Sequence, residues 1–436
     1  MDPLKEKFLK KSTSVGKQIR KILAEHGDKK VSDVNLKQVF GGARGVIMMF
    51  WETSLLDAKK GIRFRGYSIP QLRAKLPTGN GDEPLPEGLF WLMLTGSIPT
   101  EDEVKWLSKE WRRRSEVPKQ TFKILDSFPR TAHPMTQFIT AIASMSTESV
   151  FAKRYAEGMS KKDYWDAAYE DAMNLIAKLP RVAAYIYRRS FHKSDHIEPS
   201  QRLDWAANFA HMLGVSKKKD FKTLMRLYTT IHADHEGGNA SAHTMHLIGS
   251  TLSDPYNSFA GAMGSLAGPL HGLANQEVIK WIMDMLKELG TNDPTSLQIG
   301  QYVQDTLAAG KVIPGYGHAV LRQPDPRFMA QKAFAERNIK KSEFVNVVWK
   351  IYEVVPPILQ SLGKVKNPWP NVDAHSGAIL VHYGMTEYSF YTVLFGVSRA
   401  LGVLAATCWS RALGLPIERP KSVNLEWIKN YLKENA

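Results

Sequence analysis

Side chains that are able to transfer protons gather in four short stretches of this sequence. His271 lies in the turn "AGPLHGL", directly before a pattern typical of a helix. His318 follows "IPGYG", and Asp373 precedes another helical run in "NVDAHSG". Four more of the 13 histidines, His235 among them, crowd into "IHADHEGGNASAHTMH". Since the chain has neither a G-x-S-x-G turn nor a phosphate-binding glycine loop, this set indicates acid–base chemistry rather than covalent nucleophilic catalysis.

A metal site is the first alternative for the crowded histidines. His235 and Glu236 begin like the zinc helix H-E-x-x-H, but Asn239 occupies the position of the second ligand. Histidines three residues apart would share a helix face, yet "EGGN" interrupts the helix between the two pairs. Because histidines on helix faces are commonly structural, the sequence predicts no metal site.

Residues 311–328 combine a glycine-rich loop with two arginines. The glycines permit close approach of backbone to a ligand, and Arg322 and Arg327 offer paired donors to a carboxylate or a phosphate. An ordinary surface loop with solvated arginines fits the same pattern. Asp373 also has two interpretations. It is a helix N-cap if its carboxylate faces its own helix, and a base if the carboxylate faces a pocket.

An apolar segment at residues 388–415 is longer than a bilayer requires, and Arg399 lies near its centre. We predict the central helix of a large bundle rather than a membrane span. A buried guanidinium is costly unless it meets an anion. Two partners remain open for it: a distant Asp or Glu of the chain, or the carboxylate of a ligand.

The elements that must position these side chains are predominantly helices. Apolar residues recur at helical spacing, and Thr100 with Glu103 forms a capping box before one such run. Strand signals are concentrated in residues 45–69, which predict one small sheet. The prediction is an all-α fold, with helices at residues 163–178, 203–213, 221–235, 241–252, 328–335 and 344–362, and helix ends at Gly96, Pro180, Gly214, Gly290, Gly310 and Gly414.

Composition indicates the number of domains, the redox compartment and the kind of partner. The 436 residues predict two domains, and the single cysteine, Cys408, excludes an intrachain disulfide and favours a reducing compartment. Lysine and arginine outnumber the acids by 58 to 43, which suits either a nucleic-acid binder or an enzyme for anionic small molecules. Because the basic residues are scattered, without an aromatic-rich stripe, we expect no nucleic-acid partner.

Several long motifs occur in an order that resembles the citrate synthase family, in particular its eukaryotic, mitochondrial type. They are "IHADHEGGN", "LAGPLHGLANQE", "PGYGHAVLR" followed by "DPR", and "NVDAHSG", within a similarity that runs from "GGARG" to "ERPKS". The resemblance implies an all-α fold with a minor β-hairpin near the N-terminus and the active site in a cleft between two helical domains. We expect the large domain at residues 1–273 and 380–436, and the small domain at residues 274–379.

The resemblance also implies roles for individual residues. The catalytic trio is matched by His271, His318 and Asp373. Residues that hold oxaloacetate are matched by His235, Arg327 and Arg399. An arginine that the family contributes across the subunit boundary is matched by Arg419, which implies a homodimer. Elements that contact coenzyme A are matched by Arg44, Val312, Pro314, Gly315, Tyr316, Gly317 and Arg322. Where the family has a further arginine for the coenzyme A phosphates, this chain has Lys161 and Lys162, and either lysine suits that role.

The implied reaction condenses acetyl-CoA with oxaloacetate and hydrolyses citryl-CoA, with the coenzyme A thioester as co-substrate and no tightly bound cofactor. One alternative is 2-methylcitrate synthase, which uses propionyl-CoA with the same residues; a more distant one is a non-catalytic basic helical scaffold. Since a helix N-terminus disfavours imidazolium, we expect His271 to stay neutral and to donate a hydrogen bond to the forming enol.

The implied location is the mitochondrial matrix, with the cytoplasm as the alternative and no attachment to a membrane. The N-terminal segment is basic and amphipathic but carries Asp2, Glu6 and Glu25, which argues against a transit peptide. A mature organellar enzyme whose presequence has been removed fits this pattern, and so does a cytosolic enzyme.

Overall fold

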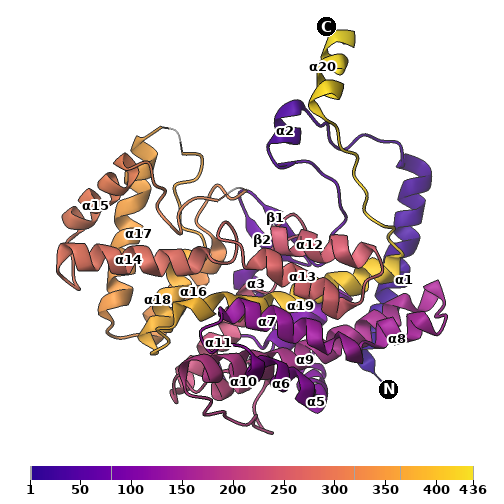
Figure 1. Cartoon of the computed structure of the whole chain (residues 1–436), viewed down its shortest axis with the longest axis horizontal. Coiled ribbons are helices and arrows are strands. Elements are labelled where there is room, and N and C mark those ends of the chain that lie inside the picture. Colours follow the sequence, from indigo (N-terminus) through magenta and orange to yellow (C-terminus); the bar gives the residue numbers. More distant parts are fainter. Residues whose placement is uncertain (1, 80, 319, 364, 436) are drawn as a thin grey trace.

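The chain forms a large helical body with a smaller group of helices at one side (Figure 1), described from a computed structural model that covers residues 2–79, 81–318, 320–363 and 365–435. Within these ranges the strands belong to one small sheet, so the predicted all-α class is confirmed. The helices of the larger body are α1 (Pro3–His26), α3 (Ile69–Lys75), α4 (Pro86–Thr95), α5 (Glu101–Arg114), α6 (Lys119–Ser127), α7 (Pro134–Ser144), α8 (Val150–Ala156), α9 (Tyr164–Phe191), α10 (Trp205–Leu213), α11 (Lys219–Ile231), α12 (Ala240–Ser250), α13 (Pro255–Leu266) and α19 (Tyr391–Leu413).

Helix α19 runs through the centre of the larger body. Tyr388–Leu413 is long and apolar enough to cross a membrane, but its most apolar stretch is 100% buried inside the protein. The helix packs against α9 and α4, and the Nε1–H of Trp409 donates to the carbonyl of Met93 at 3.0 Å. The prediction of a central bundle helix is confirmed, and its apolar sequence is explained by contacts with other helices.

The smaller group consists of α14 (Ala274–Leu289), α15 (Ser296–Ala308), α16 (Pro326–Asn338), α17 (Glu343–Ser361) and α18 (Asp373–His382). Helices α14, α15 and α17 share a hydrophobic cluster of their own, which includes Ile282, Val303 and Val347. In contrast, α16 buries Phe334 in the cluster of the larger body. The predicted small domain at residues 274–379 contains four of the five helices and the first part of α18, which continues to His382, and its boundaries stay a prediction.

The sheet occupies part of the predicted strand region. Strands β1 (Ser54–Asp57), β2 (Gly61–Phe64) and β3 (Tyr67–Ser68) are antiparallel in the order β1-β2-β3. The turn between β1 and β2 lies against the start of α16, because a Cβ on Gly61 would lie 2.6 Å from the Cγ of Pro326. The sheet therefore brings the N-terminal part of the chain into contact with the smaller group of helices.

Among the glycines and the proline predicted to end helices, Pro180 is wrong. Helices end at or just before Gly96, Gly214, Gly290, Gly310 and Gly414 as predicted, but Pro180 lies inside α9, which continues to Phe191. A proline in a helix leaves the carbonyl four residues earlier without its usual donor. Here that carbonyl belongs to Ile176, and it accepts a hydrogen bond from the Nε1–H of Trp205 at 2.9 Å. A tertiary contact thus replaces the missing helical hydrogen bond.

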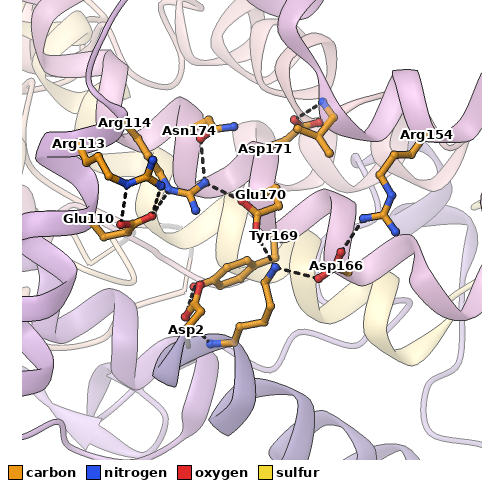
Figure 2. A network of polar contacts seen from close by, with 12 residues as sticks. Asp2, Glu110, Arg113, Arg114, Arg154, Asp166, Tyr169, Glu170, Asp171 and Asn174 are labelled. Atoms are coloured by element: carbon orange, nitrogen blue, oxygen red, sulfur yellow. Dashed lines mark hydrogen bonds and ion pairs between the residues drawn. The ribbon is translucent and has the colours of Figure 1, made fainter.

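The first turn of α1 is fixed to α9 by a network of polar contacts (Figure 2). The Tyr169 hydroxyl donates to the carboxylate of Asp2, which also caps α1. Lys5 forms ion pairs with Asp166 and Glu170 of α9. The second half of α1, together with α2 (Leu36–Phe40) and α20 (Leu425–Glu434), projects from the body (Figure 1).

We predict that Phe8→Ala destabilises the protein strongly. Phe8 is fully buried, with edge-to-face contacts to Trp165 (5.9 Å between centroids) and Trp409 (5.3 Å) that join α1 to α9 and α19. Because the cavity would lie between three helices, the free energy of unfolding should fall by about 3–5 kcal/mol. Chemical denaturation at fixed protein concentration measures this change. A loss below about 1 kcal/mol would show that this part of α1 contributes little to the core.

Candidate active site

Six of the predicted site residues line one cavity between the larger body and the smaller group of helices. They are His235, His271, His318, Arg327, Asp373 and Arg399. The cavity has a volume of about 320 Å³, which suits a small substrate. They come from the loop after α11, the turn before α14, the loop before α16 and the helices α16, α18 and α19. Packing has therefore brought together segments that are far apart in the sequence.

His235 lies outside the helix that the sequence predicted for it. Helix α11 ends at Ile231, and residues 232–239 form a loop across the side of α19. The ring is buried, and its Nε2 is without a hydrogen-bond partner in the part of the chain that the structure describes. Burial and the positive charge of Arg327 lower the pKa of His235 well below its usual value. A neutral imidazole with an unpaired nitrogen thus lines the cavity and is available to a ligand.

His271 is neutral, for reasons that differ in part from the predicted one. Burial lowers its pKa to about 4, and the positive charge of Arg399 contributes to the same shift. The ring meets the first turn of α12 rather than the helix that follows it, since the N–H of Ser241 donates to its Nε2 at 3.3 Å. The Ser241 hydroxyl lies 2.9 Å from the same nitrogen. Accepting the backbone N–H keeps Nε2 unprotonated and leaves Nδ1–H as the donor of the ring.

His318 is held in one tautomer by its own loop. Its Nδ1 accepts hydrogen bonds from the N–H groups of Val320 (3.0 Å) and Leu321 (3.1 Å). The hydrogen of the neutral ring therefore lies on Nε2. Burial, with the charge of Arg327, lowers the pKa of His318 to about 4. Its ring packs edge-to-face on His235 at 5.4 Å, so two neutral imidazoles lie side by side.

Asp373 faces the cavity and does not cap its helix. It is the first residue of α18, and its N–H donates to the Oδ1 of Asn371 at 3.0 Å. Val372 holds the N-cap position, and no side-chain cap hydrogen bond is formed at this helix start among the described residues. Burial raises its pKa to about 7, although Arg327 and Arg399 oppose the shift. Of the two interpretations of Asp373, the structure favours a carboxylate with the position and the pKa of a general base.

The two cavity arginines are held in different ways. Arg327 is buried and forms a two-pronged ion pair with Asp325, with Nε–Oδ1 at 3.0 Å and Nη2–Oδ2 at 2.6 Å. Arg399 donates to neutral acceptors, from Nε to the carbonyl of His232 at 3.2 Å and from Nη1 to the Oδ1 of Asn239 at 3.0 Å. The chain places no carboxylate in hydrogen-bond contact with Arg399 among the described residues, which favours an anionic ligand as its partner.

The remaining predicted residues lie away from this cavity wall. The loop that carries the predicted coenzyme A contacts is tied to the segment before α18: Gly317 N–H donates to Trp369 at 3.0 Å, and Asn371 N–H donates to Gly315 at 2.9 Å. Val312 is exposed, as is Arg44 in the turn after α2. Arg419 is exposed in the segment after α19. The loop is therefore joined to Asp373 through two residues, while Arg44 and Arg419 face outward.

Sequence reasoning missed the residues that hold the site residues in place. They are Asn239, Ser241, Asp325 and Asn371, each with a hydrogen bond to a site residue. In the sequence, Asn239 stands out only because it occupies the position where the zinc motif H-E-x-x-H would have its second histidine. The proximity of Asp325 to Arg327 was a usable signal, because a buried arginine at a helix start needs a nearby anion.

Comparison with known proteins places the chain in a family. Residues 42–421 match the family described as "Citrate synthase, C-terminal domain". The chain is 54% identical to the mitochondrial citrate synthase of Daucus carota over 420 residues, which are 96% of this chain and 89% of that protein. The chain belongs to the citrate synthase family.

Further relatives and solved structures agree with this assignment. The mitochondrial citrate synthase of Xiphias gladius is 53% identical over 94% of this chain and 87% of that protein. The fold is similar to citrate synthase from Pyrobaculum aerophilum, with a TM-score of 0.76 and 27% identity over 91% of this chain and 95% of the other. A ternary complex of carboxymethyl coenzyme A and oxaloacetate with citrate synthase from Thermoplasma acidophilum has a similar fold, with a TM-score of 0.75 and 22% identity over 90% of this chain and 97% of that chain.

As a citrate synthase, the chain is an acyltransferase that condenses acetyl-CoA with oxaloacetate, with the coenzyme A thioester as co-substrate. The expected function is thereby confirmed, and the alternative of a non-catalytic scaffold is set aside. The named relatives from Daucus carota and Xiphias gladius are mitochondrial proteins, which supports a mitochondrial location for this citrate synthase.

The pKa of Asp373 predicts opposite effects of pH on activity and on stability. Its charged form is lost as pH falls through about 7, so kcat/KM should fall about tenfold per pH unit below that value. The pKa of the folded protein lies above the ordinary 3.8, so folding favours the protonated acid, and stability is lost as pH rises from about 4 to 7.

Asp373→Asn should therefore raise the melting temperature more at about pH 8 than at about pH 5.5, since only the wild type carries the cost of a buried charge at the higher pH. Calorimetry of both proteins at the two pH values measures this difference. Equal shifts at both values would contradict a buried carboxyl with a raised pKa.

Proposed function

We propose that this citrate synthase works through Asp373 as base, His271 and His318 as neutral donors, and His235, Arg327 and Arg399 as the binding site for oxaloacetate. The observation that carries the proposal is the meeting of a carboxylate of raised pKa with neutral imidazoles and two buried arginines around one cavity. Each group is in the protonation state that its role requires near neutral pH.

The first step removes a proton from the methyl group of acetyl-CoA. A carboxylate is too weak a base to form a free enolate, so charge on the thioester oxygen must be stabilised as the proton leaves. Asp373 takes the proton, the C–H electron pair becomes the carbon–carbon double bond, and the negative charge that moves onto the thioester oxygen is stabilised, as an enolate, by a hydrogen bond from the Nδ1–H of His271. Because the pKa of His271 is about 4, the donor is an imidazole.

The second step forms the carbon–carbon bond. The carbon of this hydrogen-bonded enolate attacks the ketone carbon of oxaloacetate. The Nε2–H of His318 donates to the ketone oxygen as that oxygen gains negative charge. Arg327 and Arg399 bind the carboxylates, and the unpaired Nε2 of His235 is available for the same ligand. Water then hydrolyses citryl-CoA to citrate and coenzyme A.

Coenzyme A is proposed to bind along Val312, Pro314, Gly315, Tyr316, Gly317, Arg322 and Arg44, with Lys161 or Lys162 at a phosphate. Hydrogen bonds between this loop and Trp369 and Asn371 support the proposal, because they hold the loop, and a thioester bound along it, next to the segment that carries Asp373. The exposed side chain of Leu270 beside His271 offers apolar surface at the same edge of the cavity.

The active form is proposed to be a homodimer in the mitochondrial matrix, with Arg419 of each chain completing the site of the other. The projecting part of the chain supports the dimer, because it exposes apolar side chains that a monomer leaves in water. They are Ile22, Leu23, Val34, Val39, Phe40, Ile417, Leu425, Trp427, Tyr431 and Leu432.

Release of free thiol from acetyl-CoA in the presence of oxaloacetate tests the function directly, and propionyl-CoA in the same assay tests the substrate. We expect acetyl-CoA to give the higher kcat/KM. A preference for propionyl-CoA would favour the 2-methylcitrate alternative, and no thiol release with either thioester would overturn the proposal.

We predict that His271→Ala abolishes condensation while oxaloacetate binding is largely kept. The substitution removes the donor to the enol oxygen, so kcat should fall about 10²–10³-fold. Thiol release gives kcat, and calorimetric titration with oxaloacetate gives the affinity. His196→Ala is the matched control, since this histidine stacks on Tyr185 at 3.9 Å and does not line the cavity. Unchanged turnover in His271→Ala would remove this residue from the mechanism.

The role of Arg419 predicts complementation between two inactive variants. When Arg419→Ala and Asp373→Ala chains are mixed at random, half of the dimers contain one of each, and one site in each such dimer carries neither substitution. We therefore expect about a quarter of wild-type activity in the mixture. If Arg419 served the site of its own chain, no intact site would form, and the mixture would stay inactive.

A further inference from the structure

The inference concerns Asp234, a buried carboxylate in the loop between α11 and α12 that no step of the proposed mechanism uses. It is fully buried, and its Oδ2 accepts three hydrogen bonds from residues just before and within β1: from Trp51 Nε1–H at 3.0 Å, Thr53 hydroxyl at 2.5 Å and Ser54 hydroxyl at 2.8 Å. Its Oδ1 accepts the N–H of His235 at 2.9 Å. Such a carboxylate is fixed in place by its hydrogen bonds.

The backbone around Asp234 rests directly on α19, close to Arg399. The N–H of Gly402 donates to the carbonyl of Ala233 at 3.1 Å, and a Cβ on Gly402 would lie 2.5 Å from the Cβ of Asp234. Gly402 is one helical turn beyond Arg399, so the carboxylate and the guanidinium lie near each other in the core. No hydrogen bond joins them among the described residues.

We infer that Asp234 is a positioning residue of the oxaloacetate site: held by Trp51, Thr53 and Ser54, its carboxylate stabilises the buried guanidinium of Arg399 through space, without occupying the hydrogen-bonding groups of the guanidinium. A direct ion pair, like that of Asp325 with Arg327, would use donors that the substrate needs. The carboxylate therefore stabilises the charge, and the substrate carboxylate completes its hydrogen bonds.

The same contacts fix the neighbouring residues of the loop. The N–H of Glu236 donates to the Ser54 hydroxyl at 2.9 Å, and the Leu56 N–H donates to the Glu236 carboxylate at 3.3 Å. Gly237 lies under Trp51, because a Cβ there would be 2.7 Å from the indole ring. His235 is thus held on both sides by the chain that leads into β1, and Asp234 is the central contact.

This inference rests on the proposed roles of Arg399 and His235, and a comparison of the two substrates separates it from a structural role. Burial disfavours the charged form of Arg399 and lowers its pKa, and the nearby carboxylate of Asp234 opposes that effect. In Asp234→Asn the opposing charge is lost, so the buried guanidinium should be held less firmly in the cavity wall. Oxaloacetate binding should then weaken, while acetyl-CoA binding should not.

The experiment measures the KM for oxaloacetate, the KM for acetyl-CoA and kcat of Asp234→Asn at one fixed pH. We expect the oxaloacetate KM to rise about tenfold or more and the acetyl-CoA KM to stay near the wild-type value. An unchanged oxaloacetate KM, or an equal rise of both KM values, would overturn the inference. Wild-type protein without any thiol release would instead overturn the proposed function.

Asp171→Asn is the matched control, since Asp171 is also fully buried and accepts three hydrogen bonds, from the Ser149 hydroxyl (2.6 Å), Val150 N–H (2.7 Å) and Phe151 N–H (3.1 Å). It joins the start of α8 to α9, away from the cavity, and lies beside the polar network of Figure 2. This variant should lose stability without a change in the oxaloacetate KM. A similar rise in KM in both variants would show that Asp234 acts only through stability.

Trp51→Phe tests the same inference if Asp234→Asn does not fold. It removes one hydrogen bond to Asp234 and keeps both the aromatic cover and the carboxylate charge. We expect a smaller rise in the oxaloacetate KM, an unchanged acetyl-CoA KM and unchanged kcat. No rise in that oxaloacetate KM would show that the hydrogen bond from Trp51 to Asp234 does not matter for substrate binding.

Discussion

Burying the guanidinium of Arg399 inside an apolar helix is unfavourable unless acceptors or negative charge compensate for lost water. In this protein the compensation comes from two neutral acceptors, the carbonyl of His232 and the side chain of Asn239, and from the nearby charge of Asp234. None of these cancels the positive charge by direct pairing. The cavity wall consequently keeps a cation for a substrate carboxylate, and the loops around α19 are arranged to hold it.

Burial, with the charges of the two cavity arginines, sets the protonation of the neighbouring side chains. Together with burial, the charges of Arg327 and Arg399 keep the imidazoles of His235, His271 and His318 neutral. The same burial makes the carboxylate of Asp373 more basic than an exposed one. A site with two fixed cations, neutral donors and one basic carboxylate suits chemistry in which negative charge develops on oxygen while carbon loses a proton. Citrate synthesis is a reaction of this kind.

The small sheet connects the parts of the site although it contributes no catalytic group. The chain entering β1 holds Asp234 and Glu236, while the carbonyl of Ala58 after β1 accepts the N–H of Arg322 at 2.8 Å. Gly61 at the start of β2 contacts Pro326, next to Arg327. The segment from Trp51 to Gly61 therefore contacts both the loop of His235 and the stretch that carries His318 and the start of α16 with Arg327. These two regions belong to different groups of helices.

By itself the sequence determined the helical class, the central position of α19, most helix ends and the six residues that share the cavity. Periodicity and capping are local properties, and the motifs were long enough to identify the family. Only the tertiary structure decided the rest. Pro180 stays within α9 because a distant Trp205 donates to the carbonyl left free, and His271 is held neutral by burial, Arg399 and the distant Ser241. Asp373 faces the cavity rather than capping its helix, because Val372 holds the cap position, and burial raises its pKa. Protonation and hydrogen bonding depend on what surrounds a side chain in space, and that is set by packing between segments that are far apart in the sequence.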